Sequence, residues 1–183
     1  MLKIDIPETE GFDPKNSEFI KIKAQSITLE HSLVSISKWE SKWHVPYLST
    51  EKTTEQIYDY IRCMTLTQNV KPEVYFCIPK TELVRINDYI EDKMTATWFS
   101  EKDGQNRRGP LGRDIVTSEI IYYWMITLNI PMECQKWHLN RLLTLIRVCG
   151  EKNKPQDKMS KKDIMARNRA LNEARRKQYK TRG

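Results

Sequence analysis

The sequence lacks several features that would place it in a large protein class. It has no apolar run of about 18 residues, so we expect no membrane-spanning helix. Its N-terminal residues show no basic region followed by an apolar stretch, so we expect no secretory signal. Only six glycines occur among 183 residues, which argues against a fold built on glycine-rich loops around a nucleotide. The four cysteines are scattered, which favours reduced thiols in a cytosolic setting over a disulfide scaffold.

The common catalytic and metal-binding motifs are missing as well. There is no P-loop, no dinucleotide fingerprint and no G-x-S-x-G nucleophile elbow. Cys134 and His138 have the i, i+4 spacing of half a zinc site, but no C-x-x-C or H-x-x-x-H pair supplies the other half. His31 and His44 lie near the ends of predicted helices, where we expect capping or packing. We therefore predict a protein that is not an enzyme, with no catalytic residue, no metal and no cofactor.

What the sequence does contain is a sharp division of charge. Residues 151–183 hold twelve basic and four acidic side chains, a net charge of +8, which leaves residues 1–150 at −1 within the chain's total of +7. All five tryptophans and all four cysteines lie in residues 1–150. The segment 151–183 has too few large apolar residues to fold alone. We predict a compact domain over 1–150, followed by a basic C-terminal arm over 151–183 that begins with a linker at 152–158.

The domain should begin with a β element and continue as helices. Apolar and polar residues alternate over residues 1–30 on both sides of a turn signal, which indicates a β-hairpin. From Ser32 the apolar period becomes helical and stops at Pro46. Thr53 and Gln56 have capping-box spacing, so a second helix should start there. The hairpin must pack on the helices because an isolated hairpin is marginal in water.

The rest of the chain adds further predicted elements. Val74–Ile78 is a short apolar run between two prolines, which suggests a strand. Helices are expected over 81–92, over 116–128 and from Pro131 to a cap at Gly150. The 116–128 helix is apolar almost all round, as buried helices are. A mostly exposed helix is predicted from 160 to 179. The fold class is mainly α: one helical domain with a short N-terminal β-hairpin and a partly helical basic arm.

Candidate contact residues fall on both the domain and the arm. Trp39 and Trp43 lie one helical turn apart beside lysines, so the pair is either core or an exposed anchor for a partner. The loop at 107–113 is a second candidate contact, with a solvated loop as the simpler interpretation. The candidate contact residues of the arm are all basic: Arg167, Arg169, Arg175, Arg176 and Lys177.

The arm suits either the phosphates of a nucleic acid or an acidic protein surface. The domain of residues 1–150 is not basic, so no continuous positive patch joins it to the arm. The arm also lacks the interleaved aromatic residues of single-strand binders. These two features favour a protein partner, and nucleic acid stays open as the alternative.

Two parts of the sequence are similar to known proteins. The first is Leu29–Ser49 together with Ile57–Thr65, and the second is Ser118–Cys149, closed by NRALNEARRKQYKTRG. Together they resemble tail assembly chaperones and related small tail-region proteins of long-tailed bacteriophages and prophages. The resemblance spans most of residues 27–183, and the family has no catalytic or ligand motif to carry over.

The resemblance implies a non-enzymatic assembly factor that covers the tape-measure protein during tail morphogenesis, in the bacterial host cytoplasm. One alternative is a structural neck or tail component of the virion, with the arm clamping neighbouring subunits. A second alternative is a nucleic-acid-binding accessory protein. The expected partners are therefore the tape-measure protein or tail and neck subunits. A second copy of the chain and nucleic acid bound through the arm stay open, and no membrane is expected.

Overall fold

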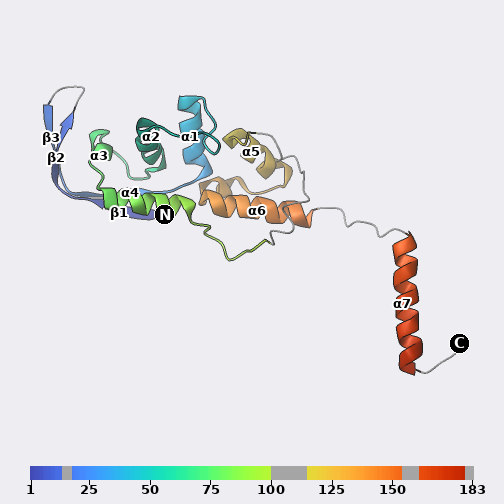
Figure 1. The fold of residues 1–183 in the computed structure, drawn as a ribbon. Helices are drawn as coiled ribbons and strands as arrows, with labels where there is room; N and C mark the ends of the chain where they lie inside the picture. The colour runs from blue at the N-terminus through green and yellow to red at the C-terminus, as the bar shows by residue number, and fades with distance from the viewer. Residues whose placement is uncertain (14–17, 100–114, 154–160, 180–183) are drawn as a thin grey trace. The chain divides into compact units, whose positions relative to one another are not determined.

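Helices dominate the computed structural model, so the prediction of a mainly α fold is confirmed (Figure 1). The structure describes residues 1–13, 18–99, 115–153 and 161–179. The chain divides into two compact units, Met1–Gly150, called the body below, and Glu151–Gly183, which is the arm. In the described part of the chain, no helix has the length and apolar character needed to cross a bilayer.

The body begins with the predicted β-hairpin, which is built from two successive pairs of antiparallel strands. The strands are β1 (Leu2–Ile6), β2 (Thr9–Asp13), β3 (Glu18–Ile22) and β4 (Gln25–Leu29). β1 pairs with β4, and β2 pairs with β3. Ile4 lies opposite Ile27, and both side chains are fully buried because alternate residues of a strand point to the same face. Figure 1 shows the β1 end of the hairpin beside α4, against which β1 packs.

Helices α1 (Leu33–Trp43) and α2 (Thr54–Met64) pack on each other, and each begins with a capping box. In α2 the Thr53 hydroxyl accepts from the Gln56 N–H while the Gln56 side chain accepts from the Thr53 N–H, which confirms the predicted start. α1 ends at His44, whose left-handed φ of 55° closes the helix before Pro46. Both boxes satisfy backbone N–H groups that a helix cannot pair internally.

The predicted strand at Val74–Ile78 is wrong. Glu73–Phe76 forms a single helical turn, α3, with Val74 and Tyr75 buried. The N–H groups of Val74 and Tyr75 donate to the carbonyls of Lys71 and Pro72 rather than to a neighbouring strand. The fixed φ of Pro72 suits the start of a helical turn, which is why the local bonds form here. The helix expected over 81–92 is present as α4 (Lys80–Glu91).

The long helix predicted from Pro131 is broken in two. A 3₁₀ helix, η3 (Met132–Lys136), comes first, and α6 (Leu139–Lys152) follows after an extended Trp137. The break arises because His138 forms a β-bridge with Ser32, and the Leu139 N–H donates to the His31 carbonyl at 2.7 Å. α6 also continues through Gly150, so the predicted cap at Gly150 is wrong as well.

Helix α5 (Ser118–Thr127) forms as predicted, but the expectation that it is buried all round is wrong. Ile121 and Met125 are fully buried, whereas Tyr123 and Ile126 are 63% and 66% exposed. The main helix in contact with α5 is α1, so one stripe of α5 is covered and the opposite stripe is open. The Ser118 N–H at the start of α5 donates to the Glu40 carboxylate of α1.

Candidate partner-binding surfaces

Trp39 belongs to the core, so of the two alternatives for this residue the exposed anchor for a partner is wrong. Its side chain has no exposed area. The indole N–H donates to the Gln56 carbonyl at 3.0 Å, and the ring meets Tyr47 edge-on with centroids 5.3 Å apart. A completely covered ring cannot touch a partner while the body is folded, so Trp39 joins α1 to α2 instead.

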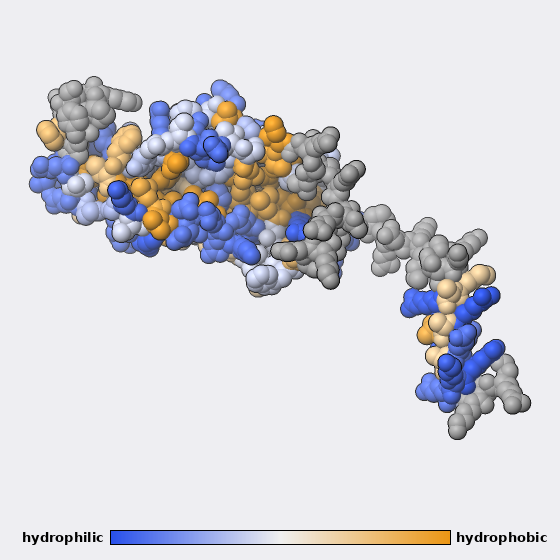
Figure 2. Space-filling view, viewed as in Figure 1, coloured by the Kyte–Doolittle hydropathy of each residue, from blue (hydrophilic) through white to orange (hydrophobic). Residues whose placement is uncertain are grey.

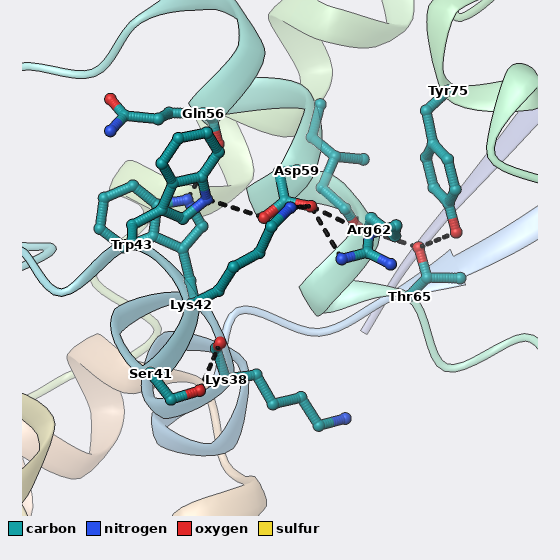
Figure 3. Close-up of polar contacts among 11 residues, drawn as sticks. Lys38, Ser41, Lys42, Trp43, Gln56, Asp59, Arg62, Thr65 and Tyr75 are labelled. Carbon is teal, nitrogen blue, oxygen red and sulfur yellow. Dashed lines mark hydrogen bonds and ion pairs between the residues drawn. The ribbon is translucent and has the colours of Figure 1, made fainter.

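Trp43 is half-buried and takes part in a polar cluster around Asp59 (Figure 3). Its indole N–H donates to Asp59 Oδ2 at 2.8 Å, while Lys42 and Arg62 pair with Oδ1 at 2.7 and 2.9 Å. Burial raises the pKa of Asp59, but the hydrogen bonds from Lys42 and Trp43 and the charge of Arg62 outweigh it. The pKa of Asp59 therefore lies below its ordinary value. The cluster connects α1 to α2, so the indole N–H of Trp43 is committed within the body.

A cleft of about 580 Å³ opens between α2 and α4. Its walls are apolar residues from the two helices, namely Ile57, Tyr58, Ile61, Leu83, Ile86 and Ile90. The side chains of Leu48 and Ile57, which line it, are nearly half exposed. Figure 2 shows apolar surface on the body where α2 and α4 lie. A sequence pattern assigns these residues to helix faces in the core, so the sequence gives no signal of the cleft.

One cation lies in this apolar cleft. Lys52 Nζ sits 4.1 Å from the centroid of the Tyr47 ring and donates to the carbonyls of Tyr47 and Thr50. Burial lowers the pKa of Lys52. Within the described residues Lys52 forms no ion pair with a carboxylate. The cleft therefore offers a partner an apolar lining with a fixed positive charge that an acidic side chain could approach.

A buried polar network begins at Tyr60, one of the residues that line this cleft. The His31 Nδ1 shares a hydrogen bond with the Tyr60 hydroxyl, which also lies 3.4 Å from the Ser35 hydroxyl. The His31 ring meets the His138 ring edge-on, with centroids 5.0 Å apart. Burial, reinforced by repulsion from the His138 ring when that ring is protonated, lowers the pKa of His31 to about 3. His31 is therefore neutral at physiological pH and packs as part of the core.

The network continues to the N-terminus through Glu30. The Tyr89 hydroxyl donates to Glu30 Oε1 at 2.7 Å, and the Met1 amino group pairs with Oε2 at 2.9 Å. His138 Nε2 lies 2.8 Å from the Tyr89 carbonyl. A carbonyl only accepts, so Nε2 must carry the proton of His138. This set of bonds holds the N-terminus, α4 and the start of α6 together.

Cys134 and His138, which have the sequence spacing of half a zinc site, do not lie on one helix. Cys134 is buried in η3, and His138 lies beyond the extended Trp137. Both ring nitrogens of His138 already have partners, because Nδ1 accepts from the Asn140 N–H. Among the residues that the structure describes, no group of three or more His, Cys, Asp or Glu side chains is placed to hold a metal ion.

The described part of the arm contains one long helix, α7 (Lys161–Tyr179), and it agrees with the helix predicted over 160–179. It carries the five basic candidate contact residues, and all of them are exposed: Arg167, Arg169, Arg175, Arg176 and Lys177. At 100° per residue these five positions spread around the helix rather than along one face. The second candidate contact, the loop at 107–113, lies outside the described residues.

No protein-family model, curated protein or solved structure matches this chain. The resemblance to phage tail proteins therefore depends on the two sequence stretches alone. On the structure, these stretches cover α1, most of α2, α5, η3, most of α6 and, in the arm, residues 168–179 of α7. They include one wall of the α2–α4 cleft, whereas α4 lies outside them.

Proposed function

We propose that this chain is a non-enzymatic assembly factor of a long-tailed phage, which binds an amphipathic helix of a tail protein. The observation that carries the proposal is the apolar cleft between α2 and α4. An amphipathic helix that lays its apolar face into such a groove is a common mode of protein recognition. The resemblance to tail assembly chaperones makes the tape-measure protein the client we favour.

The chemistry of the cleft matches what such a client needs. A tape-measure protein is a very long helix, and before assembly its apolar stripe is exposed and requires a cover. The exposed parts of the Leu48 and Ile57 side chains supply the apolar area that the body offers to the client. Lys52 adds a positive charge beside them, which favours a client helix with an acidic residue next to its apolar stripe.

The ionisable groups that line the cleft, Tyr47, Lys52 and Tyr60, suit binding of a partner rather than catalysis. Burial raises the pKa of both Tyr47 and Tyr60, so neither phenol supplies a nucleophile near neutral pH. The Lys52 ammonium is held by two backbone carbonyls. The arm, with its net charge of +8, suits an acidic segment of the client or of a neighbouring subunit.

The proposal is tested by complementing a phage from which the gene has been deleted. Tail length in electron micrographs is the measurement, and Ile57→Lys is the variant that places a charge in the cleft. Val84→Lys is the matched control, because Val84 is an exposed apolar residue of α4 that does not line the cleft. We expect Ile57→Lys to abolish normal tails and Val84→Lys to restore them. Normal tails without the gene would refute the proposal.

Quantitative mass spectrometry separates the assembly role from the structural alternative. An assembly factor is abundant in the lysate of infected cells and absent from purified particles. A fixed copy number in the finished particle would contradict the proposal and favour a neck or tail component.

A further inference from the structure

A second, smaller cleft of about 260 Å³ lies between residues 93–99 and α6. Two of the residues that line it are cations, Lys93 and Arg147, and two are aromatic, Trp98 and Phe99. The remaining lining residues carry hydroxyl or amide groups, and none of the described lining residues is acidic. This composition is quite different from that of the apolar cleft between α2 and α4.

The two cations of this cleft are arranged against its two aromatic rings. Lys93 Nζ lies 4.8 Å from the centroid of Trp98, and the Arg147 guanidinium carbon lies 3.8 Å from that of Phe99. Neither cation forms an ion pair with a carboxylate in the described part of the chain. Trp98 is 81% exposed, although tryptophan is on average a highly buried residue. The ring therefore presents most of its surface to a ligand.

The segment that carries Trp98 is attached to the body by specific hydrogen bonds. The Asn140 amide of α6 donates to the carbonyls of Ile90 and Asp92 at 3.0 and 2.7 Å. Met94 has a left-handed φ of 50°, and its N–H donates to the Asp92 carboxylate. These bonds fix the start of the segment on α6 and engage one oxygen of the nearby Asp92 carboxylate. Lys93 and Trp98 thus belong to a segment with a defined attachment.

We propose that this cleft binds one nucleotide of a single-stranded nucleic acid, with the base stacked on Trp98 and the flanking phosphates near Lys93 and Arg147. Aromatic rings that stack bases, combined with cations that follow the backbone, are the recurrent chemistry of single-strand recognition. The hydroxyls of Thr95 and Thr97 and the side-chain oxygen of Asn140, whose two amide N–H groups are already bonded, supply polar groups for a base edge or a sugar.

The size of the cleft sets the extent of the contact. At about 260 Å³ it is below the usual range of about 300–1,000 Å³ for small-molecule sites, so it holds one unit of a longer strand rather than a large free ligand. A duplex keeps its bases stacked inside, so the single strand is the favoured form. An acidic peptide offers negative charge but no ring for the exposed face of Trp98, and it is the competing ligand class.

The test measures binding of the full chain by fluorescence anisotropy. The probes are a labelled oligothymidylate of about 20 nucleotides, a duplex of the same length and a polyglutamate peptide. The variants are Trp98→Ala, Trp98→Phe and Arg147→Gln. Controls are Tyr123→Ala and Lys71→Gln, which alter an exposed aromatic and an exposed cation outside the cleft. Thermal unfolding checks that each variant keeps the fold, which is expected because Trp98 is exposed.

We expect the oligothymidylate to bind more tightly than the duplex. Trp98→Ala should weaken binding at least about fivefold, and Trp98→Phe should recover most of the loss because it keeps a stacking ring. Arg147→Gln should reduce the slope of log affinity against log salt by about 0.7, the value for one phosphate contact on a single strand. Both controls should bind like the unaltered chain.

Three results would overturn the proposal. One is the absence of oligothymidylate binding at low salt. Another is binding that Trp98→Ala and Arg147→Gln leave unchanged, which would place the strand elsewhere, such as on the basic arm. The third is a loss confined to polyglutamate binding, which would make the cleft a site for acidic peptides.

Discussion

Lowering the pH from 7 to 5 should destabilise the body by about 2 kcal/mol through His31. Burial, together with the charge of His138, lowers the pKa of His31 from 6.5 to about 3 in the folded chain. In the unfolded chain the imidazole returns to its ordinary pKa of about 6.5. Below pH 6.5 the unfolded state therefore binds a proton that the folded state does not bind.

The sign and the size follow from this difference. The contribution of His31 to stability is fully present above pH 6.5 and is lost as the pH falls towards 3. At pH 5, which is 1.5 units below the unfolded pKa, the loss is about 2 kcal/mol at about 1.4 kcal/mol per pH unit. Asp59 adds little in this window, because its folded pKa lies below the ordinary value of 3.8 and its contribution is lost only at lower pH.

Urea denaturation at pH 7, 6 and 5, followed by tryptophan fluorescence, measures the effect. His31→Gln keeps a side chain that can hydrogen-bond Tyr60 but cannot take up a proton, so its stability should be nearly constant between pH 7 and 5. His44→Asn is the control, because asparagine tolerates the left-handed cap position and His44 is exposed. It should lose the same 2 kcal/mol as the unaltered chain. An equal loss in His31→Gln would refute the assignment to His31.

Three further predictions concern the contacts within the body, and urea denaturation at pH 7 checks each of them. Trp39→Ala should cost about 3–5 kcal/mol of unfolding free energy, because it empties a fully covered site in the core; a cost below 1 kcal/mol would contradict the burial. Trp43→Phe should cost only about 1–2 kcal/mol, since it removes the N–H bond to Asp59 but keeps a ring. Glu40→Gln should cost about 1–3 kcal/mol, because the carboxylate accepts from both the Ser118 and the Tyr47 N–H and an amide keeps only one acceptor oxygen; no loss would mean that one of these two bonds is dispensable.

The sequence predicts those parts of the fold that local signals determine. The start of α2 follows from the hydroxyl of Thr53 and the amide of Gln56, which pair with each other's backbone. The hairpin follows from alternation over residues 1–30, because a period of two places Ile4 and Ile27 on the same face. Both features are indicated by local patterns, namely a capping pair three residues apart and a two-residue alternation within each strand, so the sequence is enough to predict them.

The features that the sequence did not predict depend on distant partners. The break at Trp137 exists because Ser32 and His31 bond to His138 and Leu139, and nothing in the local sequence announces that bridge. The exposed stripe of α5 has the same origin, since an apolar helix face does not reveal whether a neighbour covers it. The α2–α4 cleft is a further case, because the same apolar residues could have closed on each other as core.

The tryptophans show why candidate contact residues are the hardest to predict. Trp39 and Trp43 stand beside lysines at helical spacing, a pattern that occurs both in exposed anchors and in helices that bury an aromatic stripe between charged neighbours. The distinction comes from α2, which supplies the Gln56 carbonyl and the Asp59 carboxylate as partners for the two indole N–H groups.

Trp98 lies outside every described helix and strand, and its segment has no periodicity to indicate a contact. Its importance follows only from its exposed ring and from the two cations that the fold brings to the same cleft. For this chain, therefore, the surroundings of a tryptophan rather than its sequence neighbours determine whether it serves the core or a ligand.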